Sequence, residues 1–314
     1  ILNFGRYSLG AGVLGPAKEQ IQVAARYAQE RRQFGQPLAS FGLVQQKLAD
    51  MAVKVYAAES ASHRTAGLID GVSATGEKLD VMTPPFLRSL DEFALECSIL
   101  KVRCSEILFE VADESLQIHG GYGFTEEYSP ARVLRDARIN RIFEGTNEIN
   151  RLFIPALLAR REQRGRFPLA ATVAAVGMEI KAGRFTPALG NDLAGAGAFL
   201  ISAKKLVFFL TGLAKRKFGE KLSDEQEVAA AMSDIICEIF LGESAVLRAR
   251  KAAAAGEGAI HADLARLFVN ESSLRLEACA RRILEASVTE MDLPIYIETV
   301  RRLLFWRPLD SVAL

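Results

Sequence analysis

The chain has few of the residues that build metal centres and disulfide frameworks. Its 314 residues include only four cysteines and three histidines, and the cysteines lack the spacing of metal-ligand pairs. We therefore predict no metal site and interpret the thiols as reduced and buried. The net charge is only +1, which gives no basis for a nucleic-acid-binding surface.

Strand-like alternation is almost absent, whereas apolar residues recur at helical steps of three and four. The clearest stripe is Phe93, Cys97, Leu100, Cys104, Ile107 and Val111. We predict an all-α protein: a helical-bundle domain over residues 1–160, then a second helical domain over 168–314. The boundary is placed at the charged segment that Pro168 closes. One helix is expected over 6–31, with a kink at Pro16.

Residues 204–217 contain an apolar run that lysine and arginine flank on both sides. It is far shorter than the roughly 20 residues that a membrane-spanning helix needs. We interpret it as a core helix with cationic ends, and contact with a lipid surface is the alternative.

Residues 117–153 concentrate glycines and arginines around one isolated glutamate. Gly120, Gly121 and Gly123 would let the backbone pass close to a ligand. Their spacing differs from the dinucleotide-binding G-x-G-x-x-G pattern, and a helical pattern precedes them. A helix C-cap followed by a turn is the alternative. We interpret the adjacent His119 as a packing residue.

A row of arginines follows the glycines. Arg135, Arg138 and Arg141 would lie on nearly one face if their segment is helical. Such a row could bind phosphate, but Asp136 interrupts it. Solvent-exposed ion pairs are the ordinary alternative.

Glu144 lies between Phe143 and Gly145, just before Thr146, which we predict caps a helix over 148–158. A carboxylate that removes a weakly acidic carbon-bound proton needs a raised pKa. Dehydration by a bulky substrate raises it, whereas a helix N-terminus lowers it. The residues alone leave two interpretations open, a general base and an ordinary first-turn glutamate.

Four motifs in this order resemble the C-terminal helical domain of the acyl-CoA dehydrogenases. They are Glu30-Arg31-Arg32-Gln33-Phe34-Gly35, Gln117-Ile118-His119-Gly120-Gly121-Tyr122-Gly123-Phe124, Arg135-Asp136 and Phe143-Glu144-Gly145-Thr146-Asn147-Glu148-Ile149. Each motif is weak alone, whereas the ordered set is specific. The remainder of the chain, from about residue 167, more loosely resembles the extra helical region of the very-long-chain branch.

The resemblance implies a reaction and its residues. It identifies Glu144 as the base that abstracts the α-proton of an acyl-CoA while the β-hydrogen leaves as hydride to the flavin. The residues implied to bind FAD are Arg31, Gln33, Phe34, Gln117, Gly120, Gly121, Thr146 and Glu148. Those implied to lie beside the substrate are Asn3, Arg6 and Gly145. Some branches of the family carry the catalytic glutamate immediately before the arginine that matches Arg6. This chain has Gly5 at that position, which favours Glu144 as the base.

The resemblance also implies partners. The motifs around Arg31 and Gln117 match parts of the family that bind the FAD of a neighbouring subunit, so a homo-oligomer is expected, and the extra region suggests a homodimer. The implied electron acceptor is an electron-transfer flavoprotein. The implied location is the cytoplasm in a bacterium and the mitochondrion in a eukaryote.

The sequence starts inside a helical pattern, without methionine. We therefore expect a fragment that lacks the family's N-terminal and middle domains and is inactive by itself. Two alternatives to a long-chain acyl-CoA dehydrogenase remain open: an acyl-CoA oxidase, and a helical assembly or docking module.

Overall fold

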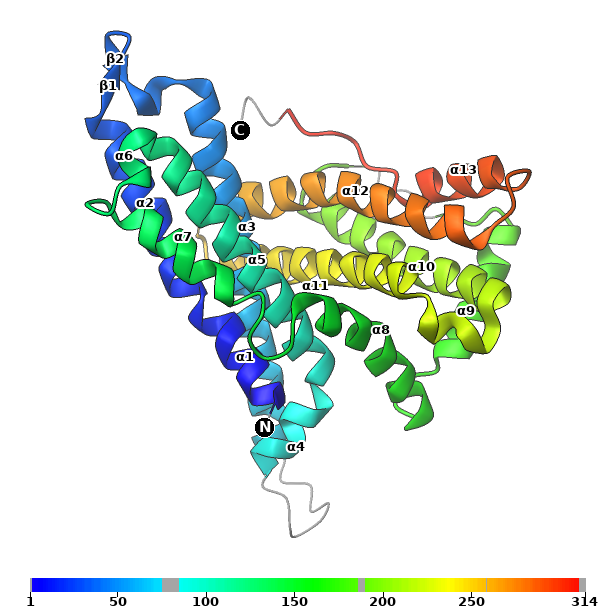
Figure 1. Cartoon of the computed structure of the whole chain (residues 1–314). Helices are drawn as coiled ribbons and strands as arrows, with labels where there is room; N and C mark the ends of the chain where they lie inside the picture. Colours follow the sequence, from blue (N-terminus) through cyan, green and yellow to red (C-terminus); the bar gives the residue numbers. More distant parts are fainter. Residues whose placement is uncertain (1, 75–84, 186–189, 258, 311–314) are drawn as a thin grey trace. The chain divides into compact units, whose positions relative to one another are not determined.

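The structure, a computed structural model, describes residues 2–74, 85–185, 190–257 and 259–310. Helices make up almost all of this part of the chain, which confirms the all-α prediction (Figure 1). The chain divides into two compact units, Ile1–Asn150 and Arg151–Leu314. The division falls inside helix α8 (Asn147–Gln163), ahead of the charged segment where the sequence places the boundary.

The first unit is built around the long helix α5. Its elements are α1 (Leu2–Gly12), α2 (Leu14–Glu30), β1 (Arg32–Gln33), β2 (Gln36–Pro37), η1 (Leu38–Ser40), α3 (Gly42–Ala74), α4 (Pro85–Glu92), α5 (Ala94–His119), α6 (Gly121–Phe124), α7 (Ser129–Ile139) and the start of α8. Helices α1, α2, α3 and α7 all contact α5. A helix surrounded in this way is buried on several faces, and some of the charged residues that it carries, such as Lys101 and Glu106, are buried as well.

The predicted apolar stripe forms the core of α5. Cys97 and Cys104 are completely buried there, and burial raises the pKa of both thiols to about 12. A thiol with such a pKa is protonated at neutral pH and is a poor nucleophile. Both cysteines therefore act as small core residues, as predicted.

The single helix expected over 6–31 is two helices, because the chain breaks at Val13 between α1 and α2. Pro16 has no N–H to offer the carbonyl group of Gly12, and its ring crowds that carbonyl. The break therefore lies three residues before the proline. Glycine, serine, threonine and two prolines between Gly71 and Pro85 predict a loop. This prediction is in part wrong, since α3 continues to Ala74. The rest of that loop lies outside the described residues.

The second unit consists of the remainder of α8 and five further helices with one 3-10 turn among its described residues. They are α9 (Leu169–Lys181), α10 (Leu193–Phe218), η2 (Gly219–Asp224), α11 (Gln226–Ala254), α12 (Ala259–Ser287) and α13 (Leu293–Leu303). Helix α10 contacts α9, α11, α12 and α13. It is therefore the central helix of this unit.

Helix α10 contains the apolar run singled out in the sequence. Within the described chain, Leu193–Asp224 is the one stretch long and apolar enough to cross a membrane, and the core helix of a soluble protein meets the same criterion. Phe199, Leu206 and Leu210 are completely buried. The flanking Lys204 and Lys205 form ion pairs with glutamates of the same unit. These contacts support the interpretation as a core helix.

Candidate active site

The candidate catalytic glutamate lies in a tight turn between α7 and α8. Glu144 has a backbone φ of 57° and the next residue, Gly145, has a φ of 80°. The left-handed region is open to glycine but costs other residues roughly 1 kcal/mol. A glutamate held there indicates that the surrounding structure fixes it, a common feature of functional sites.

Two buried side chains hold this turn. The Nδ2 of Asn150 donates to the carbonyl oxygens of Gly145 at 2.8 Å, Thr146 at 3.0 Å and Glu144 at 3.3 Å. The Nε of Arg6 also donates to the Glu144 carbonyl, at 3.4 Å. Because Asn150 is completely buried, water cannot replace its donors without opening the turn.

The start of α8 is capped as the sequence predicts. The Thr146 hydroxyl accepts a hydrogen bond from the backbone N–H of Ile149 at 3.3 Å, which is the geometry of an N-cap residue. The helix itself begins at Asn147 and continues to Gln163, five residues beyond the predicted end. Glu148 lies exposed in its first turn.

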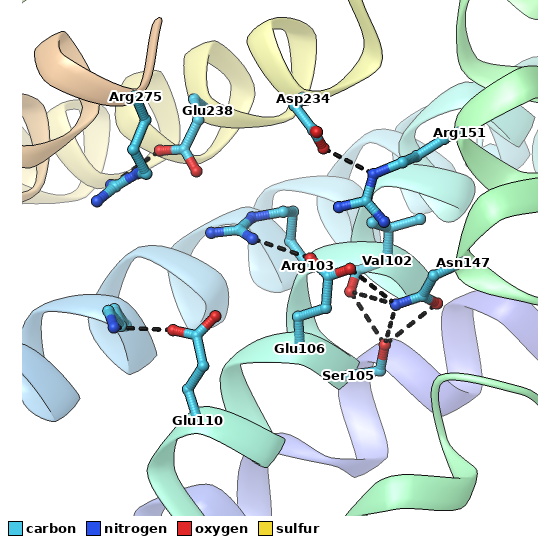
Figure 2. Close-up of polar contacts among 11 residues, drawn as sticks. Val102, Arg103, Ser105, Glu106, Glu110, Asn147, Arg151, Asp234, Glu238 and Arg275 are labelled. Atoms are coloured by element: carbon cyan, nitrogen blue, oxygen red, sulfur yellow. Dashed lines mark hydrogen bonds and ion pairs between the residues drawn. The ribbon is translucent and has the colours of Figure 1, made fainter. Parts of the chain in front are cut away.

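Asn147 fastens this helix start to α5 through a buried polar network (Figure 2). Its Nδ2 donates to Ser105 Oγ and Glu106 Oε1, both at 3.1 Å. Its Oδ1 accepts from Lys101 Nζ at 2.7 Å. Burial lowers the pKa of Lys101 to about 8, although the Glu106 and Glu148 carboxylates favour its charged form. The turn thus rests on buried hydrogen bonds between the start of α8 and α5.

The first helix supplies the opposite wall. The Glu144 carboxylate packs directly on Gly5, where an added Cβ would lie 2.4 Å from its oxygens. A side chain at position 5 and the Glu144 carboxylate therefore could not both occupy this space. The next residue, Arg6, is buried, and its Nη1 donates to Asn3 Oδ1 at 3.3 Å. The structure thus brings Asn3 and Arg6 together with Glu144 and Gly145.

A second group of predicted residues gathers at the C-terminal end of α5. Gly120 has a φ of 61° and caps this helix, which confirms a C-cap and turn. The Arg31 guanidinium lies 5.4 Å from the centre of the Tyr122 ring. Gln117, Gly120 and Gly121 are exposed, and a Cβ added at either glycine would meet nothing within 4 Å. The backbone here is open to a ligand.

His119 plays the packing role predicted for it. Its ring stacks on Tyr27 with a centroid distance of 4.1 Å, and its Nδ1 lies 2.7 Å from the Ser115 carbonyl oxygen. The side chain is buried. It therefore supports the glycine turn from beneath and offers no free nitrogen at the surface.

The segment after Arg31 is a two-residue hairpin, a small exception to the strand-free prediction. Arg32 pairs with Pro37 and Gln33 with Gln36. The loop residues Phe34 and Gly35 have φ values of 52° and 84°, as in type I′ turns, where Asn-Gly is the favoured pair. Phe34 is 91% exposed. A phenylalanine in this position is unfavourable for both the turn and solvation.

The two groups lie towards opposite ends of α5. Lys101, beneath the glutamate turn, and His119, beneath the glycines, are 18 residues apart in this helix. At 1.5 Å per residue their separation is about 27 Å. The structure therefore assembles two half-sites in the first unit, a carboxylate half-site and a glycine-arginine half-site.

The predicted arginine row is wrong in one member. Helix α7 ends at Ile139, so Arg141 lies beyond it, with its guanidinium 5.5 Å from the centre of the Phe109 ring. Arg135 forms an exposed ion pair with Glu126 at 3.3 Å. The sequence motifs do not include Lys101 or Asn150. A lysine set between Cys97 and Cys104 on an apolar stripe was the available signal for the first.

Comparison with known proteins identifies the family. A family model described as the acyl-CoA dehydrogenase C-terminal domain matches residues 1–158, half of the chain. The chain belongs to the acyl-CoA dehydrogenase family. A second model with the same description matches residues 202–302. The resemblance inferred from the four motifs is thereby confirmed.

Relatives extend the match along the whole chain. A probable acyl-CoA dehydrogenase of Bacillus subtilis (strain 168) is 39% identical over 309 residues, covering 96% of this chain and 52% of that protein. The mitochondrial very long-chain specific acyl-CoA dehydrogenase of Mus musculus is 40% identical over 154 residues, 49% of this chain and 21% of that protein. The chain spans about half the length of its Bacillus subtilis relative.

Solved structures agree with the fold of the chain. The crystal structure of an acyl-CoA dehydrogenase from Bacillus anthracis, complexed with FAD, is 39% identical and has a TM-score of 0.94. The match covers 99% of this chain and 54% of the Bacillus anthracis chain. An acyl-CoA oxidase from Yarrowia lipolytica shares the fold, with a TM-score of 0.70 and 20% identity. The match covers 96% of this chain and 46% of the oxidase.

Proposed function

We propose that the protein carrying this chain oxidises long-chain acyl-CoA thioesters to trans-2-enoyl-CoA, with FAD as cofactor and Glu144 as the base. The observation that carries the proposal is the conformation of Glu144. Its backbone is held in the left-handed region by Asn150 and Arg6, while its carboxylate is fixed against Gly5. Such a constraint suits a group whose position matters for chemistry.

In this reaction the Glu144 carboxylate takes the proton from the substrate α-carbon. The β-hydrogen leaves with its electron pair, and the C–H electrons left on the α-carbon form the new double bond. FAD, when bound, supplies the acceptor for that hydride. Arg6 and Asn3 border the carboxylate and would position the thioester end of the substrate. A bulky acyl chain over the half-buried carboxylate would exclude water and strengthen the base.

The glycine-arginine half-site fits the diphosphate of FAD. Gly120 and Gly121 leave the backbone accessible, and the planar guanidinium of Arg31 can donate in parallel to phosphate oxygens. Gln117 is exposed beside them. The Bacillus anthracis relative was crystallised with FAD, which supports the same cofactor here. Gln33 and Phe34 would extend the contact from the hairpin.

We further propose that two copies of the chain complete each FAD site. The half-sites are about 27 Å apart along α5, and the ring and diphosphate of one FAD are joined only by a short ribityl chain. The carboxylate half-site of one copy would hold the reactive end of the cofactor. The glycine-arginine half-site of the second copy would hold the nucleotide end. A homodimer satisfies this arrangement, and an electron-transfer flavoprotein is the proposed acceptor of electrons.

The deciding experiment is anaerobic bleaching of the flavin by palmitoyl-CoA in the full-length protein. Glu144→Gln keeps the shape of the side chain but cannot take the proton, so FAD should stay bound while bleaching slows by about 10³-fold. Glu126→Gln, at an exposed glutamate outside both half-sites, should bleach normally. Unchanged bleaching in Glu144→Gln would place the base elsewhere, and an unaltered protein without flavin would contradict the proposed reaction.

A further inference from the structure

The second unit contains an apolar cavity of about 510 Å³. Helices α8, α9, α10 and α11 and the turn η2 line it, and Leu152, Val207, Met232 and Ile236 are among its wall residues. None of the residues of the two half-sites contributes to it. Its volume lies within the range of roughly 300–1,000 Å³ that is typical of small-molecule sites.

The cavity exists because its walls carry small side chains where large ones would fill it. Ala156, Ala159, Ala214 and Ala229 come from three helices and face the same space. Protein interiors are normally packed as densely as organic crystals, with few voids larger than a water molecule. An apolar wall gives water too few hydrogen-bond partners. A hydrocarbon is therefore the occupant that suits this space.

Polar contacts fix the wall between α8 and α11. Pro155 lies inside α8 and has no N–H for the carbonyl of Arg151. The Ser233 hydroxyl of α11 donates to that carbonyl in its place. The Arg151 Nε also donates to Asp234 Oδ1 at 2.8 Å (Figure 2). Because these contacts tie the two helices together, the cavity is already formed and needs little rearrangement to accept a ligand.

The polar lining of the cavity includes one cation, Lys215, which is exposed near the end of α10. The nearest carboxylate oxygen paired with it, from Glu162, is 4.0 Å away. Thr211, Ser223 and Glu220 also line the cavity. Among the described residues, Lys215 is the one lining cation and its pair with Glu162 is long, so it can pair with one negative charge of a headgroup. The Glu162 and Glu220 carboxylates would repel the further charges of a polyanionic headgroup.

From this combination we infer that the cavity binds a long-chain fatty carboxylate. The alkyl chain occupies the apolar space between α8, α10 and α11, and the carboxylate pairs with Lys215. This site does not depend on the proposed dehydrogenation, because it shares no residue with the half-sites. It assigns the second unit a ligand of its own.

The test is calorimetric titration of the full-length protein with dodecanoate and palmitate, each below its micelle concentration. Saturable binding of one carboxylate per chain is expected. Lys215→Gln should weaken it about fivefold without changing the binding of dodecanol, which has no charge. Lys217→Gln removes an exposed cation of the same helix end that does not line the cavity, and should bind as the unaltered chain does.

Filling the cavity tests its location. Ala229→Phe places a ring in the space and should weaken dodecanoate binding at least tenfold, and Ala156→Phe does the same from the more exposed wall. Ala253→Phe, at an exposed position of α11, is the matched control. The inference is overturned if no carboxylate binds saturably, or if both folded filling variants bind normally. Tighter binding of dodecanoyl-CoA than of dodecanoate would overturn the assignment of a singly charged headgroup.

Discussion

The two half-sites of the first unit are built in opposite ways. The turn around Glu144 is held by buried donors from Asn150 and Arg6 and by a polar network on α5. The surface around Arg31 and Gly120 has exposed side chains and open backbone. A group that must meet one carbon–hydrogen bond needs a fixed position, whereas a surface that receives a flexible phosphate needs access and charge.

Backbone strain marks both regions. Among the described residues, Phe34 and Glu144 are the non-glycine residues with a positive φ. Phe34 lies beside the glycine-arginine half-site and Glu144 in the carboxylate half-site, and each belongs to one of the four sequence motifs. Buried hydrogen bonds offset the strain at Glu144, while the hairpin turn and an edge contact with the Phe41 ring hold the exposed Phe34. Substitutions should therefore affect folding strongly in the first region and weakly in the second.

The largest effect on folding is expected for Asn150→Leu. Three carbonyl oxygens lose one buried donor, so the free energy of unfolding of the first unit should fall by about 3 kcal/mol. The measurement is urea unfolding followed by hydrogen exchange of α5 peptides, which reports this unit alone. Asn140→Leu is the control, because Asn140 is less buried and donates to carbonyls at the end of α7. Similar losses of unfolding free energy in Asn150→Leu and Asn140→Leu would contradict the role assigned to the buried donor at the Glu144 turn.

Lys101 should give the first unit a distinctive pH dependence. Its pKa is about 8 in the folded chain, against an ordinary value of 10.5. Between these values the unfolded chain keeps a proton that the folded chain has lost, so stability rises with pH. Over this window the unaltered protein should gain on the order of 2 kcal/mol relative to Lys101→Met.

The same α5 hydrogen-exchange readout, taken at pH values from neutral to alkaline, measures this difference. Lys18→Met removes a lysine whose side chain is 52% exposed, so it should keep the slope of the unaltered protein. Equal slopes in Lys101→Met and the unaltered protein would mean that burial does not lower the pKa of Lys101 as described.

Gly5→Ala should have an intermediate effect on folding and a larger one on activity. The new methyl group would lie 2.4 Å from the Glu144 carboxylate oxygens, so the carboxylate must move, at a cost of about 1–2 kcal/mol. Gly12→Ala is a matched control in the same helix, with nothing within 4 Å of the added carbon, and should be neutral or slightly stabilising. Normal flavin bleaching in Gly5→Ala would show that the carboxylate position tolerates movement.

The sequence predicted the half-sites better than it predicted what supports them. The four motifs located Glu144, Arg31 and the glycines because these residues are arranged in local order along the chain. Lys101 acts through a contact with Asn147, 46 residues away in the sequence, and a single helix pattern does not display that contact. Asn150 donates to carbonyls four to six residues before it, but these meet its side chain only because the turn at Glu144 and Gly145 has a positive φ. The break at Val13 was misplaced for a related reason, because proline disturbs the carbonyl four residues before it.

The smallest effect on folding is expected at the exposed half-site. Phe34→Asn creates the Asn-Gly pair that type I′ turns favour, so the hairpin should be unchanged or more stable by less than about 1 kcal/mol. The variant also removes the edge contact between the Phe34 and Phe41 rings, whose centroids are 6.3 Å apart. If Phe34 contacts the FAD of a second copy, flavin should dissociate more readily from the full-length protein while α5 exchange stays normal. Retained flavin, or exchange as fast as in Asn150→Leu, would show that the two half-sites do not divide binding and positioning in this way.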